Sequence, residues 1–498
     1  MKTRPSARRP SRNSCASSRN ASGRSPSCAC GSRPRSGSDP ARQEETAMSE
    51  RRPEAVPMRT NALWIFGDQH RGQMRSCHGD PNVNTPNIDL LACQGLDFPQ
   101  AVSGFPLCCP FRGSLLTGRY PHHCVPGHEY PLPRDARTIA HVFNEAGYRT
   151  AYFGKWHLGG HKERDGRAAF FITDPAQRGG FQQWIGYDNN NSPWDSWVHG
   201  GEGKDAFHYR LPGYETDALT DLLLAYLKER LQKPEEPFFA VLSVQPPHDP
   251  YLAPPEFMAR HHPARLQLRP NVPRFPRVEE RARRDLAGAC AQVENLDWNL
   301  GRIMDFLRSS GLFFNTHVLF FSDHGDLHGS HGHFRKTNPL EESIRIPFTI
   351  GGVRPDAYGP WRCGRSAVPI NHVDIAPTTL GLCGLEVPAW MEGTDFSGHR
   401  LATRPRAQEP DSAFLQSVIP TGHGDSIDRP WRGIVTRDGW KYVCLPGQSW
   451  LLFDLNEDPY EQANLAHNPA FKTRRTQLLE RLRQWIDGTD DAFELPRD

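Results

Sequence analysis

Short apolar runs alternate with longer segments of helical periodicity through most of the chain. Runs with few polar positions are typical of strands that are buried on both faces of a parallel sheet. Such runs occupy residues 61–66, 148–153, 237–244 and 317–322. The segments between and after them predict helices at residues 85–95, 135–146, 217–231, 279–310 and 374–382,. This alternation predicts an α/β fold, with a doubly wound and mostly parallel sheet flanked by helices.

The pattern changes after about residue 385. Three short segments, 433–436, 440–444 and 451–454, have the spacing of hairpin strands, and Arg437-Asp438-Gly439 is a turn signal between the first two,. An amphipathic helix is expected over residues 470–487. We therefore predict a large α/β domain over residues 58–385 and a smaller α+β subdomain with an antiparallel sheet over residues 386–498.

Charge is distributed unevenly along the chain. Residues 1–57 contain 12 Lys and Arg against 5 Asp and Glu, a net charge of +7, which leaves −5 for the rest of the chain. This first segment is rich in Arg, Ser, Pro and Gly, so we predict a disordered tail. It lacks the apolar centre of a secretory signal, and no run of about 18 apolar residues occurs elsewhere. We expect a cytoplasmic protein that binds neither nucleic acid nor a membrane.

Polar side chains of related chemistry follow four of the predicted strands. Asp68 and Gln69, Lys155 and His157, His248, and Asp323 and His324 each stand at or just after the end of an apolar run. Because ligands collect at the carboxyl edge of an open parallel sheet, we expect these groups to form one cluster. Taken singly, Asp68 and Asp323 could equally be turn residues. Together with Gln69 and His324 they predict a divalent-cation site for Ca²⁺, Mg²⁺ or Mn²⁺.

A cysteine pair opens another notable stretch, residues 108–118. Pro110 suits the first position of a helix and Gly118 suits a helix end,. We therefore expect Cys108 just before a helix N-terminus, where free N–H groups favour negative charge. Two adjacent cysteines could also simply be buried, and the spacing around them does not fit a zinc site.

This stretch resembles the sulfatase signature, in which a cysteine followed by x-Pro-x-Arg and later by Leu-Thr-Gly is oxidised to formylglycine. Cys108 takes the modified position, Cys109 a variable one, and Phe111 stands where many members carry a small hydroxyl residue. Further segments also resemble recurrent sulfatase segments, in family order from about residue 60 to 467. They are Thr85–Asp89, Gly154–Gly159, Pro246–Pro250, Lys336 shortly after the Asp323–Gly325 turn, Val373–Thr378 and Leu452–Pro459. The resemblance implies an alkaline phosphatase-like fold.

The resemblance also implies a mechanism and a set of roles. The hydrate of formylglycine at Cys108 would attack sulfur, aided by a divalent cation, and then expel sulfate to regenerate the aldehyde. The cation, Ca²⁺ first and Mg²⁺ or Mn²⁺ as alternatives, would be held by Asp68, Gln69, Cys108, Asp323 and His324. The implied catalytic residues are Cys108, Arg112, Lys155, His157, His248 and Lys336, of which Lys155, His248 and Lys336 would also bind the sulfate.

The implied activity is hydrolysis of a sulfate ester or sulfamate. A phosphonate monoester or phosphodiester hydrolase with the same nucleophile is the alternative, and an inactive binding protein with this fold is another. The expected partners are a small sulfated substrate, which is a sugar, aryl or alkyl sulfate, and, transiently, a formylglycine-generating enzyme. Assembly into a homo-oligomer is left open. Residues 160–215 lack periodicity and are rich in Gly, Asn, Asp and Trp, so we expect a substrate-facing insertion,. Its Trp194 and Trp197 could stack on a sugar ring or pack in the core.

Overall fold

The computed structural model describes residues 59–353, 362–424 and 427–497. The tail predicted over residues 1–57 lies outside the described residues. No helix in the described ranges is long and apolar enough to cross a membrane. The domain boundary at residue 385 stays a prediction.

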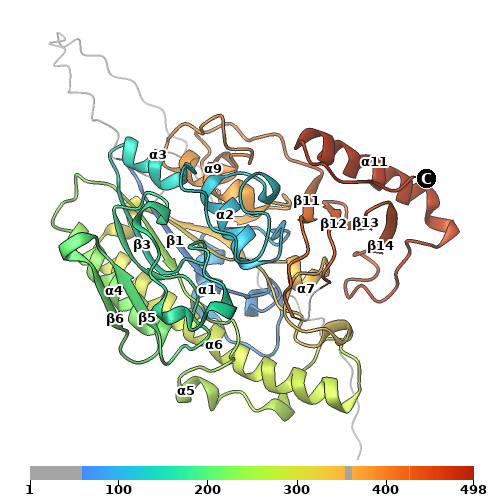
Figure 1. The fold of residues 1–498 in the computed structure, drawn as a ribbon, viewed down its shortest axis with the longest axis horizontal. Helices are drawn as coiled ribbons and strands as arrows, with labels where there is room; N and C mark the ends of the chain where they lie inside the picture. Colours follow the sequence, from blue (N-terminus) through green and yellow to red (C-terminus); the bar gives the residue numbers. More distant parts are fainter. Residues whose placement is uncertain (1–58, 354–361, 425–426, 498) are drawn as a thin grey trace, which may run out of the picture. The chain divides into compact units, whose positions relative to one another are not determined.

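A ten-stranded mixed sheet forms the centre of the fold, in the order β10-β2-β9-β8-β1-β7-β3-β4-β5-β6 (Figure 1). Its middle strands, from β8 to β4, run parallel to one another. The antiparallel neighbours β9 and β5 continue the sheet towards its two edges. The strand bounds are β1 Asn61–Gly67, β2 Leu96–Asp97, β3 Arg149–Lys155, β4 Gln183–Tyr187, β5 Trp197–Gly200, β6 Phe207–Arg210, β7 Phe238–Ser243, β8 Thr316–Ser322, β9 Phe348–Gly352 and β10 Gly364–Arg365. The predicted mostly parallel α/β sheet is confirmed.

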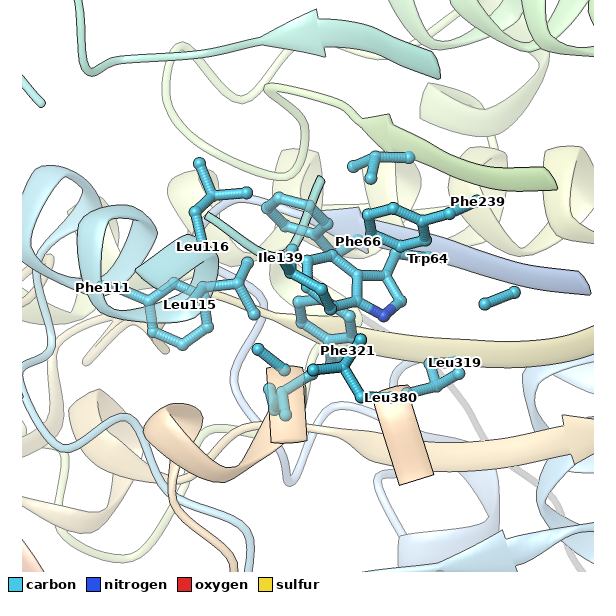
Figure 2. Close-up of a cluster of buried hydrophobic side chains, with 14 of the residues drawn as sticks. Trp64, Phe66, Phe111, Leu115, Leu116, Ile139, Phe239, Leu319, Phe321 and Leu380 are labelled. Atoms are coloured by element: carbon cyan, nitrogen blue, oxygen red, sulfur yellow. The ribbon is translucent and has the colours of Figure 1, made fainter. Parts of the chain in front are cut away.

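Alternating side chains of the central strands pack on opposite faces of this sheet. In β1, Trp64 and Phe66 join a core shared with α2, α3 and α9, whereas Leu63 and Ile65 join a core shared with α1, α4 and α6. Figure 2 shows the first core, where Trp64 and Phe321 lie close to Leu115, Leu116 and Ile139. The helix bounds are α1 Pro86–Gln94, α2 Cys108–Thr117, α3 Ile139–Glu145, α4 Glu215–Arg230, α5 Pro255–Met258, α6 Pro276–Ser309, α7 Glu341–Ile344, α9 Ile375–Leu382 and α10 Ser397–Arg400. The helices thus cover both faces of the sheet, as a doubly wound fold requires.

The chain ends in a four-stranded antiparallel sheet and a helix. Three of its strands were predicted, and the first, β11, was not, because its buried polar residues interrupt the apolar pattern. The helix covers the sheet through Leu478, Leu479 and Leu482, which pack against Phe414 and Tyr442. The bounds are β11 Ser412–Ser417, β12 Trp431–Thr436, β13 Trp440–Leu445, β14 Gln448–Asp454 and α11 Lys472–Gly488.

Two local predictions need correction. Helix α2 begins at Cys108 after the extended residue Leu107, so Cys108 is its first residue and Pro110 is its third. The proline still fits, because none of the first four N–H groups of a helix has a partner within the helix. The predicted end is confirmed, since Gly118 has φ 66°. Helix α3 begins at residue 139 rather than 135, because Thr138 caps it and accepts a hydrogen bond from Ala140 N.

Candidate active site

Four adjacent parallel strands, in the order β8-β1-β7-β3, bring the predicted polar residues to one edge of the sheet. Asp68 directly follows β1, Lys155 is the last residue of β3, and Asp323 directly follows β8. His248 follows β7 by five residues. These strands meet in register because each is a continuous apolar run of similar length, so their carboxyl ends coincide.

The sulfur of Cys108 lies in the middle of this cluster, and its side chain is buried, at 2% exposure. Its Sγ lies 3.2 Å from His324 Nε2, 3.6 Å from Asp68 Oδ1, 3.6 Å from Lys336 Nζ and 4.0 Å from Lys155 Nζ. Burial, followed by the negative charge of Asp68, raises the pKa of the Cys108 thiol to about 12. An unmodified thiol in this position is protonated near neutral pH and therefore weakly nucleophilic.

Arg112 lies one helical turn after Cys108 and faces the same cluster. Its NH2 atom lies 3.2 Å from both Asp68 Oδ2 and Asp323 Oδ2. Its NH1 atom donates to the Lys155 carbonyl and to Ser243 Oγ, both at 2.8 Å. Arg112 is therefore a buried cation that bridges the ends of four strands, β1, β3, β7 and β8.

Lys336 and His248 form a second cationic contact beside the sulfur. Lys336 Nζ lies 2.7 Å from His248 Nε2 and 2.8 Å from Gln69 Oε1. His248 Nδ1 donates to the Asp249 carbonyl at 2.7 Å, so Nε2 is the nitrogen that accepts from Lys336. Burial and the charge of Lys336 lower the pKa of His248 to about 4, so the ring is neutral near pH 7.

Two buried carboxylates face each other across Cys108. Burial disfavours the charge of Asp68, but Lys155, His248 and Lys336 hold its pKa well below the usual range. Lys155 Nζ lies 2.6 Å from Asp68 Oδ2. The pKa of Asp323 rises to about 7, because burial and the charge of Asp68 outweigh the effect of Arg112.

This donor set suits a divalent cation. One ligand atom from each of Asp68, Cys108, Asp323 and His324 can be chosen so that all lie within 4.8 Å of one another. His324 Nδ1 donates to the Gly325 carbonyl at 3.0 Å, which leaves Nε2 facing the group. Carboxylate oxygens with an imidazole fit Ca²⁺, Mg²⁺ or Mn²⁺, and a cation between the two carboxylates would favour the charged form of both. The residues therefore fit the cation that the sequence predicts.

His157 is the predicted residue that stands furthest from the sulfur contacts. It follows β3 with φ 53° and its backbone N–H donates to the Asp188 carbonyl. Its Nδ1 is buried without a hydrogen-bond partner, and its ring lies 5.7 Å from the ring of His128. His157 lines the same pocket as Cys108, but no hydrogen bond between the two is seen among the described residues.

A pocket of about 470 Å³ opens above Cys108, and loops far apart in the sequence form its wall. The wall includes several residues that the sequence did not single out, because they lie in irregular loops without periodic pattern or motif. The predicted insertion contributes Asn189 and Asn191, whereas its neighbour Trp156 is fully buried in the core. The other unpredicted lining residues are His128, Glu129, Arg335, Thr421, Gly422, His423 and Gly424.

Comparison with known proteins identifies the family. The family model described as Sulfatase matches residues 60–385. The chain belongs to the sulfatase family. A second model, described as N-sulphoglucosamine sulphohydrolase, C-terminal, matches residues 329–487 of this sulfatase. The motif resemblance, the enzyme class and the alkaline phosphatase-like fold predicted from sequence are thus confirmed.

Relatives of this sulfatase match along most of their length. It is 34% identical over 456 residues to an ulvan-active sulfatase of Formosa agariphila, covering 88% of this chain and 83% of the relative. It is 29% identical over 467 residues to an endo-4-O-sulfatase of Bacteroides thetaiotaomicron, covering 81% and 87% of the two chains. A solved structure from work on glycosaminoglycan metabolism by Bacteroides thetaiotaomicron matches with TM-score 0.76 and 26% identity, over 87% of this chain and 97% of that one. The phosphonate monoester hydrolase of Agrobacterium radiobacter shares the fold, with TM-score 0.70 at 21% identity over 86% of this chain and 96% of that one.

Proposed function

We propose that this sulfatase removes sulfate from a sulfated carbohydrate and that residue 108 acts as formylglycine. The main support is the position of the Cys108 sulfur between one carboxylate, an imidazole and two ammonium groups, at 3.2 to 4.0 Å. Relatives named for ulvan, for 4-O-sulfate and for N-acetylglucosamine 6-O-sulfate support a carbohydrate substrate.

Asp68, Gln69, Asp323 and His324, together with residue 108, would hold a divalent cation, with Ca²⁺ as our first choice. When present, the cation supplies Lewis acidity and formylglycine supplies an oxygen nucleophile. Arg112 orients Asp68 and Asp323 by contacting both carboxylates at 3.2 Å. The chain thus prepares the site through buried contacts that exist before substrate enters.

Lys155, Lys336 and His248 would contact the sulfate group. Cations placed there stabilise the negative charge that accumulates on the sulfate oxygens during the reaction. A proton of Lys336 Nζ lies between this nitrogen and His248 Nε2, which are 2.7 Å apart. This pair can therefore deliver a proton to the leaving oxygen of the substrate. His157, which lines the same pocket, has a buried Nδ1 without a partner and can accept a proton when sulfate is expelled.

Replacement of the two adjacent cysteines tests the identity of the nucleophile. Cys109 is the matched control, because it is the adjacent thiol and is also buried, but its Sγ accepts from Glu129 N at 3.3 Å, whereas the Cys108 sulfur contacts Lys155 and Lys336. We expect Cys108→Ala to lower kcat for 4-nitrophenyl sulfate by about 10⁴-fold or more, and Cys109→Ala to lower it by less than about tenfold. Peptide mass spectrometry of active enzyme should show loss of the thiol sulfur at residue 108 and an unchanged residue 109. Full activity with unmodified Cys108 would refute the proposal.

The alternative substrate should also be tested. The sequence left open a phosphonate monoester hydrolase with the same nucleophile, and an enzyme of that class shares the fold. Turnover of 4-nitrophenyl sulfate and of 4-nitrophenyl phenylphosphonate should be measured with one enzyme preparation. We expect the higher kcat/KM for the sulfate. A higher kcat/KM for the phosphonate would instead identify the enzyme as a phosphonate monoester hydrolase.

A further inference from the structure

A second pocket of about 330 Å³ adjoins the pocket above Cys108. Asn189 and Asn191 line both pockets, so the two are separated only by this short loop. The second pocket is otherwise lined by the first half of the insertion, including His161 and Arg167. A molecule that fills both pockets must therefore extend well beyond one sulfated ring.

The walls of the second pocket are held in place by buried hydrogen bonds. The Asp188 carboxylate accepts from Gly159 N at 2.6 Å and from His161 N at 3.0 Å, which fixes one wall against the asparagine loop. Asn190 Nδ2 donates to Ser196 Oγ at 2.8 Å and holds the loop from its other side. A pocket with these contacts is formed before any ligand binds.

His161 offers an unused polar group to this pocket. The residue is 7% exposed, and its Nε2 is buried without a hydrogen-bond partner. A buried polar nitrogen without a partner is destabilising unless a ligand or water completes it. A sugar hydroxyl can serve as either donor or acceptor and so can complete it in either tautomer.

An exposed aromatic ring contacts the wall of the same pocket through Arg167, one of its lining residues. Phe170 is 56% exposed, and the Arg167 guanidinium lies over its ring at 5.3 Å. The Phe170 ring also lies 5.7 Å from Trp197. Arg167 and Arg210 both form ion pairs with Asp195. These ion pairs hold the Arg167 side chain in place. A flat apolar ring next to polar groups suits the face of a sugar, which presents C–H groups bordered by hydroxyls.

We propose that this second pocket binds the sugar unit next to the sulfated one, so that the substrate is an oligosaccharide or polysaccharide rather than a sulfated monosaccharide. This inference rests on the proposed sulfatase reaction at Cys108. Phe170 packs against a face of the neighbouring sugar, and His161 Nε2 hydrogen-bonds one of its hydroxyls.

The test compares three probes: 4-nitrophenyl sulfate, a sulfated monosaccharide, and sulfated disaccharides and tetrasaccharides prepared from ulvan and chondroitin sulfate. We expect kcat/KM to rise at least tenfold from the monosaccharide to an oligosaccharide of one series. Phe170→Ala should lower oligosaccharide kcat/KM about tenfold, mainly through KM, and change 4-nitrophenyl sulfate turnover less than twofold. His161→Phe, which keeps a ring but removes the nitrogens, should have the same selective effect. Phe275→Ala is the control, because Phe275 is 69% exposed but directly precedes α6, outside the insertion that forms the second pocket.

Two outcomes would overturn the proposal. One is equal kcat/KM for monosaccharide and oligosaccharides; the other is an equal loss on small and long probes in Phe170→Ala. If no probe releases sulfate, the proposed reaction is refuted. Calorimetric binding of the same probes to the full-length Cys108→Ala variant then still tests whether the second pocket binds a neighbouring sugar. Tighter binding of oligosaccharides that is weakened by Phe170→Ala supports it, and no gain in affinity with length refutes it.

Discussion

Replacing Arg112 by Met removes the only cation that contacts both buried carboxylates of the described site. Asp323 Oδ2 then loses the hydrogen bond that Arg112 donates to it, whereas Asp68 keeps Lys155 at 2.6 Å. Coulomb's law with an effective dielectric constant of about 20 gives about 5 kcal/mol for each 3.2 Å contact,. Since desolvation of Arg112 offsets part of this, we expect a net loss of about 3–5 kcal/mol in the free energy of unfolding.

Thermal melting with EDTA or with excess Ca²⁺ measures this loss and tests the cation site at once. All variants should carry Cys108→Ala, so that modification of residue 108 does not differ among them. In EDTA we expect Arg112→Met to melt about 3–5 °C below its parent, since about 1 kcal/mol shifts the midpoint of a chain this long by about 1 °C. Ca²⁺ should raise its melting temperature more than that of the parent, because the cation binds the folded site and replaces the lost positive charge.

Arg75→Met is the matched control for this experiment. Arg75 is also fully buried and lies 2.8 Å from a carboxylate, that of Asp97, but it is not among the residues of the candidate cation site. It should destabilise the protein in EDTA and gain no more from Ca²⁺ than the parent does. An equal Ca²⁺ response of Arg112→Met and Arg75→Met would refute a cation between Asp68 and Asp323.

Two further predictions concern the stability of the fold. Burial opposes the charge of Asp97, but His78 and Arg75 lower its pKa overall, so its contribution is present above pH 4 and is lost as the pH falls further,. The gap in melting temperature between the parent and Arg75→Met should therefore narrow between pH 7 and pH 3; a constant gap would contradict this assignment. Gly154 has φ +104°, and a Cβ there would lie 2.0 Å from the Ser243 carbonyl oxygen. Gly154→Ala should lower the free energy of unfolding by about 2–4 kcal/mol, as measured by urea titration. An unchanged urea midpoint would contradict this and show that β3 can shift to make room for the methyl group.

Much of the candidate site could be predicted because its residues lie next to strands with a clear apolar pattern. Asp68, Lys155 and Asp323 each lie at or directly after the end of a parallel strand, and strand direction alone brings such ends together. His248 was also expected at this edge, because it follows the end of another apolar run, whereas Lys336 depended on motif resemblance. The pocket wall from His128, Thr421 and His423 was not predicted, since nothing local to these residues indicates that their loops meet.

The sequence by itself determined the four adjacent central strands of the main sheet and most of the helices on it, and it predicts Cys108 rather than Cys109 as the modified residue. Both follow from local patterns: apolar periodicity for the elements, and the spacing to Arg112 for the cysteine. Only the tertiary structure decided the strand order, the antiparallel edges formed by β9 and β5, and the start of α2 at Cys108. It also decided that Asn189 and Asn191 separate two pockets. These features depend on contacts between distant segments, and such contacts leave no periodic signal in the chain.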